Sequence, residues 1–430
     1  MRILITTVFF PPQNAIASQR PYVWAREWAR AGHDVTVLTI GKDTGKGDLS
    51  PQSFDGFRVI ATSPGFVISK LRARKKKPTA ASGEVGRGNL NRLKRWLKYR
   101  GLLSSVRLPD IFDFWVPEAR KVLREDLAEL KFDYIVSTFG PPASLRVGHA
   151  AKKQNAKAKW IVDFRDLWSE NHVYRGFWPL TYFEKFLERF YLSKADGVVT
   201  VSEALARTLR EKAPTKPVHV FENGFDPDEM RERIPYQDGG NIRLVYTGSL
   251  HPIQRNPEPL FQALAKLSTE HRRKFEVIFA GANADFLFSL VNKYSLAEVV
   301  QFAGSLDRKA SLKLQANASV LLFFEFQHPT AVDGVLTGKL FEYLATGRPI
   351  WAIGIDSFTT VGQLIEKNQV GNAFGQDVDA LRTSLEKLAQ TAPAKSRDVD
   401  NENDLIHKFD RKKTALKMLS WMEKEPVQKS

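Results

Sequence analysis

The stretch Gly334-Val-Leu-Thr-Gly-Lys-Leu-Phe-Glu-Tyr-Leu-Ala-Thr-Gly-Arg-Pro-Ile350 is the most informative part of this chain about its fold class. It predicts a loop, a helix of about three turns and the start of a buried strand, because Leu340, Phe341 and Leu344 recur on one helical face. Gly347 follows the last of these periodic positions and is expected to end the helix. A helix between a loop and a buried strand is typical of an α/β fold.

The start of this helix suits an anion. Thr337 and Gly338 lie where several backbone N–H groups have no partner within the helix and point into the preceding space. Lys339 and Arg348 add positive charge, and a helix N-terminus favours negative charge by roughly 0.3–1 kcal/mol. Glu342, one turn further on, would reach the hydroxyls of a sugar beside a bound phosphate. The alternative is that Lys339 and Glu342 are an ordinary solvent-facing helix pair.

The length and composition limit the number of domains and the kinds of site that the chain is able to form. At about 150 residues per domain, 430 residues allow two or three domains, each with a full core. Hydrophobic residues make up 43% and charged residues 26%, which is ordinary for a folded protein. The absence of cysteine excludes disulfides, thiolate metal sites and cysteine nucleophiles. No apolar run reaches the roughly 18 residues of a spanning helix, so we expect no membrane crossing.

The net charge of +16 is concentrated in one segment. Residues 61–110 contain thirteen Lys or Arg and two acids, a net of +11. Residues 90–100 predict a basic amphipathic helix with a tryptophan near its apolar face, and such a helix suits an anionic membrane surface. The predicted membrane-binding residues are Arg72, Arg74, Lys75, Lys76, Lys77, Arg95, Trp96 and Lys98. The alternative is a solvated flap over the domain's own surface. The charge follows no nucleic-acid-binding motif, so we expect no nucleic-acid partner.

Strands and helices alternate on both sides of a predicted linker at residues 227–240, which contains charged residues, two prolines and two glycines. The strand, loop, helix and strand at residues 2–40 open a doubly wound domain, and the repetition after residue 241 predicts a second parallel sheet. Asp163-Phe-Arg-Asp-Leu-Trp168 ends a buried strand, so ligands are expected beside it. Arg165 and Asp166 there either bind a substrate or form a structural ion pair.

Three motifs resemble retaining glycosyltransferases of family 4: Thr337–Ile350, Asp163–Trp168 and Gly32–Thr39. The resemblance implies an α/β chain with the GT-B architecture, in which two Rossmann-like, doubly wound domains face each other and a C-terminal helix crosses back. It places an acceptor domain at residues 1–230, with a basic membrane-facing insertion at about 64–110. A nucleotide-sugar domain follows at 241–400, and the returning helix lies within 401–430.

The resemblance also implies site residues. Donor-binding positions are Gly248, Arg255, Gly304, Thr337, Gly338, Lys339, Leu340 and Glu342. Acceptor-binding positions are Asn14, Arg20, Arg165, Asp166 and Trp168. Arg255 and Lys339 would stabilise the leaving diphosphate, and Asp166 is the candidate general base. Gly334 stands where the family commonly has a first glutamate, with Asp333 one position away.

The function implied is transfer of a sugar from a nucleotide-sugar, expected to be a UDP-sugar, to a hydroxyl of a lipid-linked or saccharide acceptor. Such an enzyme would act in cell-surface polysaccharide or lipopolysaccharide biosynthesis, on the cytoplasmic face of the membrane and peripherally attached to it. No metal or other cofactor is expected. Two alternatives remain open: a nucleotide-sugar epimerase of the same fold, and a non-catalytic, membrane-associated member.

Overall fold

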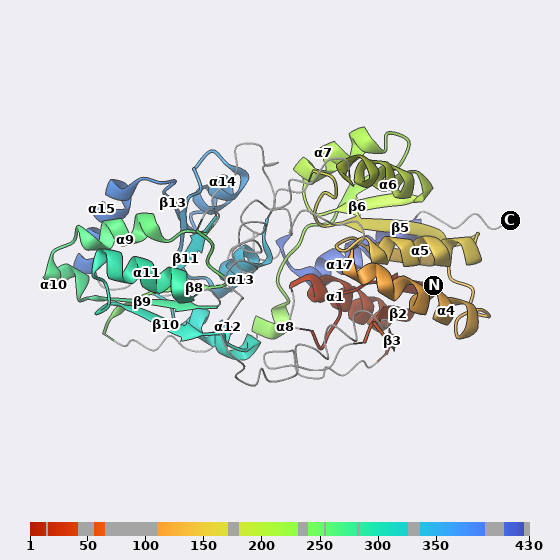
Figure 1. Ribbon diagram of the computed structural model, residues 1–430, viewed down its shortest axis with the longest axis horizontal. Helices are drawn as coiled ribbons and strands as arrows, with labels where there is room; N and C mark the ends of the chain where they lie inside the picture. The colour runs from red at the N-terminus through yellow and green to blue at the C-terminus, as the bar shows by residue number, and fades with distance from the viewer. Residues whose placement is uncertain are drawn as a thin grey trace, which may run out of the picture. The chain divides into compact units, whose positions relative to one another are not determined.

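The structure is a computed structural model (Figure 1) that describes residues 1–13, 16–41, 56–64, 110–170, 180–230, 240–252, 255–281, 284–325, 336–391 and 408–424. Asn14, Asp333, Gly334 and all the predicted membrane-binding residues lie outside these ranges. The chain divides into two compact units. Unit 1 comprises Met1–Thr44, Ser50–Glu222 and Ala415–Ser430, and unit 2 comprises Gly45–Leu49 and Asn223–Thr414.

Unit 1 contains a parallel sheet with helices on both faces. Its strands are β1 (Arg2–Thr6), β2 (Asp34–Ile40), β3 (Arg58–Thr62), β4 (Tyr134–Thr138), β5 (Lys159–Phe164), β6 (Gly197–Thr200) and β7 (Val218–Val220). Its helices are α1 (Ile16–Arg30), the 3-10 helix η1 (Ile111–Trp115), α4 (Val116–Glu125), α5 (Ala143–Gln154), α6 (Leu180–Lys194) and α7 (Glu203–Lys212). The strand order β3-β2-β1-β4-β5-β6-β7 reverses direction at β1, which is the doubly wound pattern.

The side chains of β1 alternate between two buried layers. Ile3 and Ile5 pack in the same core cluster as Trp24 and Trp28 of α1. Thr6 lies on the opposite face, where its hydroxyl donates to the carbonyl of Ser144 in α5 at 3.1 Å. Because helices cover both faces, the central strands β1 and β4 are buried on both sides instead of alternating between buried and exposed residues.

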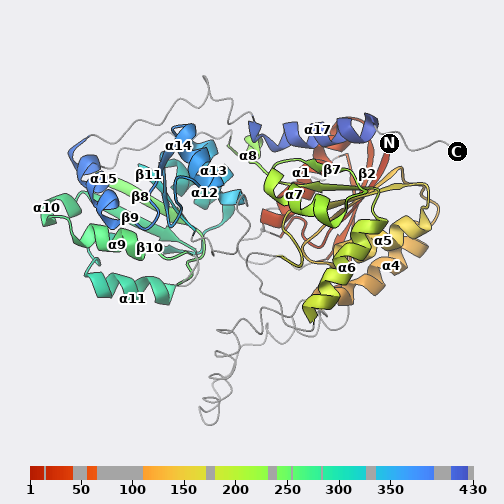
Figure 2. The same ribbon diagram turned by 90° about the horizontal axis from the view of Figure 1, so that it is seen from above.

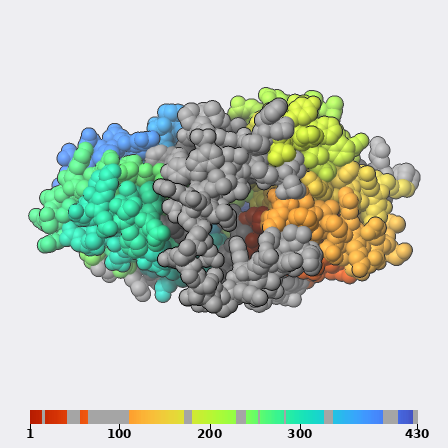
Figure 3. Space-filling view, viewed as in Figure 1, coloured from red at the N-terminus to blue at the C-terminus, as the bar shows by residue number. Residues whose placement is uncertain are grey.

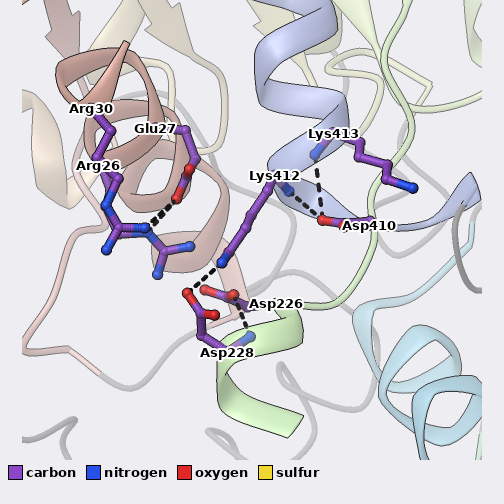
Figure 4. A network of polar contacts seen from close by, with 8 residues as sticks. All are labelled: Arg26, Glu27, Arg30, Asp226, Asp228, Asp410, Lys412 and Lys413. Atoms are coloured by element: carbon purple, nitrogen blue, oxygen red, sulfur yellow. Dashed lines mark hydrogen bonds and ion pairs between the residues drawn. The ribbon is translucent and has the colours of Figure 1, made fainter. Parts of the chain in front are cut away.

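The last described helix, α17 (Arg411–Lys424), begins in unit 2 and belongs to unit 1 from Ala415 onward. Its start is capped by Asp410, whose carboxylate accepts the backbone N–H of Lys412 at 2.8 Å, and Lys412 pairs with Asp228 (Figure 4). Further along, the carbonyl of Ala415 accepts the indole N–H of Trp28 at 2.9 Å. The C-terminal helix therefore returns to the N-terminal unit, as the GT-B resemblance implies.

Unit 2 contains a second parallel sheet, with strand order β10-β9-β8-β11-β12-β13. Its strands are β8 (Ile242–Thr247), β9 (Phe275–Ala280), β10 (Val300–Gly304), β11 (Val320–Phe324), β12 (Ile350–Ile353) and β13 (Gly371–Ala373). Its helices are α8 (Pro227–Met230), α9 (Glu258–Ala265), α10 (Thr269–Arg272), α11 (Ala284–Tyr294), α12 (Arg308–Ala316), α13 (Gly338–Thr346), α14 (Thr360–Lys367) and α15 (Val378–Gln390).

Alternating residues of β8 again separate two cores. Leu244 and Tyr246 pack with apolar residues of α9, α11 and α15. Val245 packs on the other face with residues of α13 and α14. The two groups of helices lie on opposite faces of the sheet in Figure 2. Since α13 follows β11 in a parallel sheet, its N-terminus lies at the carboxyl-end edge, where ligands bind in such folds.

Candidate functional site

Helix α13 is the helix predicted for residues 337–347. Thr337 is its N-cap residue with extended backbone (φ −76°, ψ 150°), and its side chain caps no N–H. Gly347 ends it at φ 68°, a left-handed conformation that glycine adopts without strain. The buried surface is wider than the predicted face, because Glu342 and Tyr343 are buried as well. Glu342, only 6% exposed, is therefore not an ordinary solvent-facing helix residue.

Lys339 points from the start of α13 towards the end of β8. Its ammonium donates to the hydroxyl of Tyr246 at 3.0 Å and lies 4.1 Å from the centre of that ring. Removal of the ammonium from water, together with the positive charge of Arg255, lowers the pKa of Lys339 to about 7. A lysine in this state gains charge when an anion binds, so the site is suited to a diphosphate.

Gly248 makes room for the ammonium. A Cβ at this position would lie 2.3 Å from the Nζ of Lys339, and the backbone has φ 143°. Gly281 is equally constrained, because its Cβ would lie 2.1 Å from the carbonyl oxygen of Gly248. Gly248, directly after β8, therefore leaves space for the ammonium of Lys339. Gly281, directly after β9, leaves space for the backbone of Gly248.

Two more charged residues complete this cluster. Arg255 lies after the loop, where its backbone N–H donates to the carbonyl of His251 at 2.9 Å. Glu325, directly after β11, has its pKa raised by burial, while the charges of Arg255 and Lys339 act in the opposite direction. Arg255 and Lys339 therefore both act on the partly buried Glu325, and the carboxylate of Glu342 also acts on Lys339.

A second network surrounds Glu342. Its carboxylate accepts from the guanidinium of Arg308 at 2.5 Å and from the amide of Gln315 at 3.5 Å. Gln315 also donates to the hydroxyl of Thr247 at 3.0 Å, and the backbone N–H of Thr247 donates to the hydroxyl of Tyr343 at 3.0 Å. These bonds fix Glu342 relative to the end of β8.

Two further predicted donor-binding positions, Gly304 and Leu340, differ in their surroundings. Gly304 ends β10 at φ 71°, and its carbonyl accepts the N–H of Gly281 at 2.8 Å. Leu340 is fully buried in the core, and its N–H donates to the carbonyl of Thr337 at 3.1 Å. The side chain of Leu340 is therefore unavailable to a ligand.

In unit 1, Arg20 forms buried contacts within the fold. It is 5% exposed and its guanidinium donates to the carboxylate of Asp163 at 3.1 Å and to the carbonyl of Glu222 at 3.2 Å. Burial lowers the pKa of Arg20, and Asp163 opposes this shift. Asp163 is fully buried, so neither partner of this ion pair is presented to an acceptor, contrary to the expectation for Arg20.

The loop after β5 is organised by backbone contacts. Arg165 donates to the carbonyls of Phe139 at 3.1 Å and Gly140 at 3.4 Å, and the described residues show no ion pair with the neighbouring Asp166. Asp166 is half-buried. Trp168 is fully buried and stacks on Phe139 with ring centroids 5.3 Å apart. Trp168 thus packs the loop from within, so its ring does not contact an acceptor as predicted.

Glu188 of α6 holds the end of this loop. One carboxylate oxygen accepts the backbone N–H of Trp168 at 3.2 Å, and the other accepts from the hydroxyl of Ser169 and from the ammonium of Lys212 at 2.9 Å. Glu188 is 1% exposed. The loop that carries Asp166 is therefore anchored to α6 and α7.

Sequence reasoning missed Glu325, Arg308, Gln315 and Glu188. Glu325 carries a usable signal, since it is a charged residue directly at the carboxyl end of a buried strand. Arg308 and Gln315 carry none, because their partner Glu342 lies 34 and 27 residues further along the chain.

No helix in the described residues is long and apolar enough to span a membrane. The same residues contain no cluster of three or more histidine, aspartate or glutamate side chains that would hold a metal ion.

Solved structures share this fold. Sucrose-phosphate synthase from Thermosynechococcus elongatus aligns over 99% of both chains with 17% identity and a TM-score of 0.65. HepE from Anabaena, solved in complex with UDP and glucose, aligns over 99% of this chain and all of its own with 16% identity and a TM-score of 0.58. The lipopolysaccharide outer core galactosyltransferase WaaB aligns over 97% of this chain and 100% of its own with 12% identity and a TM-score of 0.56.

Residues 17–224 match the family model described as the glycosyl transferase 4-like domain. No curated protein matches the chain significantly. The two parallel sheets and the returning helix give the chain the GT-B fold that these solved structures share. The family match covers 208 of the 430 residues, so it is this segment that is similar to glycosyltransferases of the family.

Proposed function

We propose that this protein is a retaining transferase that moves a sugar from a nucleotide-sugar, expected to be a UDP-sugar, to a hydroxyl of a lipid-linked acceptor. The observation that carries the proposal is the cluster of Lys339, Arg255 and Glu325 beside the uncapped N-terminus of α13. The likeness to HepE, which was solved with UDP and glucose, and to the galactosyltransferase WaaB supports a nucleotide-sugar donor.

In this proposal the donor diphosphate lies against the start of α13. Backbone N–H groups at Thr337 and Gly338 donate to its oxygens, and Lys339 and Arg255 neutralise the charge that builds as the bond to the sugar breaks. Glu342 accepts from the ribose hydroxyls. No metal or other cofactor is required for this arrangement, because helix N–H groups and cations supply the positive charge.

The transfer step needs no strong base, because the leaving diphosphate is able to accept the proton of the acceptor hydroxyl. The acceptor hydroxyl forms a bond to the anomeric carbon while the bond from that carbon to the diphosphate oxygen breaks. The hydroxyl proton passes to an oxygen of the departing diphosphate, which leaves on the same face of the sugar. Asp166 is the candidate if a carboxylate takes the proton instead.

We further propose that the acceptor is anchored in a membrane, as in cell-surface polysaccharide or lipopolysaccharide assembly. The charge of residues 61–110 supports this proposal, with thirteen basic residues against two acids. The likeness to WaaB, a lipopolysaccharide outer core enzyme, supports the same class of acceptor. The protein would then act at the cytoplasmic face of the membrane, peripherally attached by the basic segment.

The test is a release assay. Purified protein is mixed with a panel of UDP- and GDP-sugars and a membrane lipid extract, and free nucleoside diphosphate is measured. The wild type is compared with Lys339→Ala and Glu342→Ala, and the exposed residues Lys367 and Glu270 of the same unit supply matched controls as Lys367→Ala and Glu270→Ala.

Lipid-dependent release from one donor, reduced about tenfold to a thousandfold in both site variants but not in the controls, supports the proposal. A donor that is altered without lipid would point to epimerase chemistry. Absence of release from every donor, with intact binding to anionic vesicles, would refute transfer and favour a non-catalytic role.

A further inference from the structure

Helix α6 has its charges arranged in an unusual way. Both of its acids, Glu184 and Glu188, are buried, at 0% and 1% exposed. Its three bases, Lys185, Arg189 and Lys194, all lie on the exposed side. The outward side of this helix is therefore purely basic, whereas solvent-facing helices of folded proteins usually mix both signs.

The same side carries large aromatic rings. Tyr182 is 72% exposed, Phe183 54% and Phe186 61%, although rings of this size are normally buried. Positions 182, 183 and 186 fall on one helical arc, and Lys185 and Arg189 lie along one side of it. We call the five residues Tyr182, Phe183, Lys185, Phe186 and Arg189 the outer face of α6. In the space-filling view, yellow-green atoms from this part of the chain lie at the surface (Figure 3).

Basic residues of the neighbouring helices continue this surface. Arg120 of α4, Lys153 of α5 and Lys194 all act on His149, whose pKa is lowered first by burial and then by these three charges. The ring of His149 packs edge-on against Phe190 of α6, with centroids 5.4 Å apart. Helices α4, α5 and α6 lie side by side in Figures 1 and 2, and each contributes a basic residue beside His149, although α4 also carries the acids Glu118 and Glu125.

We propose that the outer face of α6 is a docking surface for an anionic phospholipid bilayer. Exposed aromatic rings between basic side chains match the headgroup region, where rings enter the acyl boundary and bases reach lipid phosphates. The complementary charge distinguishes this partner from another apolar protein surface, because all the charged groups of the outer face have one sign.

This inference deepens the proposed function, and it rests on that function for its purpose. The inner side of α6 holds the loop after β5 through Glu188, which accepts the backbone N–H of Trp168 and the hydroxyl of Ser169. One helix would thus hold the candidate acceptor loop on one side and the membrane on the other. Docking would position Asp166 at a fixed distance from the lipid surface.

The chain contains no cysteine, so one introduced cysteine carries a probe at a single known position. Phe186→Cys is labelled with an environment-sensitive fluorophore, and Phe358→Cys, at a position 74% exposed in unit 2, is the matched control. Each protein is added to vesicles of phosphatidylcholine alone or mixed with phosphatidylglycerol, both containing a lipid-attached quencher. Label 186 should be quenched on the anionic vesicles only, and label 358 on neither.

A second measurement uses substitution. Lys185→Gln with Arg189→Gln should weaken binding to anionic vesicles by about 25-fold, taking roughly fivefold per basic residue near the surface. The triple variant Tyr182→Ser, Phe183→Ser, Phe186→Ser should lose donor turnover with vesicle-embedded acceptor and keep it with acceptor in detergent. Phe288→Ser with Phe358→Ser, which also removes exposed rings, should change neither.

The proposal is overturned if label 186 stays unquenched while the protein still binds the vesicles, since binding would then come from another part of the chain. A label change without lipid that rises with protein concentration would indicate a second copy on this face and would also overturn it. Lack of donor turnover by the wild type would count against the proposed function alone, because quenching does not depend on turnover.

Discussion

The pKa of Lys339 makes a strong prediction about nucleotide binding. Its value of about 7 in the free protein means that the amine is half charged near neutral pH. A bound diphosphate raises this pKa, because it places negative charge beside the ammonium. Binding therefore takes up a proton, and affinity is highest below pH 7 and falls as pH rises above the free-protein pKa.

The magnitude follows from this value. If only the charged amine binds well, the dissociation constant rises in proportion to 1 + 10^(pH − 7), so it increases about 50-fold between pH 7 and pH 9. About half a proton is taken up per UDP at pH 7 and nearly one at pH 8.5. Isothermal titration calorimetry with UDP, in buffers of different ionisation enthalpy, measures both quantities.

Two variants separate this effect from others. Lys339→Arg keeps its charge at every pH in this range, so its affinity should not change between pH 7 and pH 9. Lys339→Met should bind about tenfold more weakly or worse and take up no proton. A wild type whose UDP affinity is constant from pH 7 to pH 9, with no proton uptake, would refute the reasoning.

Three further variants test the neighbouring contacts. Glu342→Gln should weaken binding of UDP several-fold more than binding of 2′-deoxy-UDP, because the carboxylate is expected to accept from ribose hydroxyls; equal losses would contradict this. Gly248→Ala should weaken UDP binding by tenfold or more, since its Cβ would lie 2.3 Å from the Nζ of Lys339. Glu188→Ala should lower the free energy of unfolding by about 3 kcal/mol in denaturant titrations, because it removes a partner of Lys212 from a buried ion pair.

Two of these variants have a control variant. Glu270→Gln changes an exposed carboxylate in unit 2 and should leave nucleotide binding unaltered. Gly32→Ala also lies at a positive φ, 89° against 143° for Gly248, but has no atom within 4 Å of the added Cβ, so it reports the cost of backbone strain alone. Loss of UDP binding in Gly32→Ala would mean that the effect at Gly248 is global instability. An unchanged stability of Glu188→Ala would show that Glu170, 3.5 Å from Lys212, replaces the lost partner.

Local sequence patterns predicted the alternation of strands and helices in both units. The stretch ending at Ile350 predicted a helix that stops at Gly347, and it does. The second strand expected within residues 2–40 also agrees with the structure, as β2 (Asp34–Ile40). Helix periodicity, capping and strand patterns act between residues a few positions apart, so one sequence contains their full signal. The GT-B architecture was implied only by the resemblance of three motifs to glycosyltransferases of family 4.

Which side chains are available to a ligand depended instead on tertiary packing. Arg20 and Trp168 look like ligand contacts in the sequence, yet both are buried within unit 1. Glu342 gains Arg308 as a partner, and Glu325 joins Lys339, through packing of elements distant in sequence. Residue type and spacing determine which chemical groups a side chain is able to bind. Burial and long-range partners, which depend on how strands and helices pack, decide whether it is free to do so.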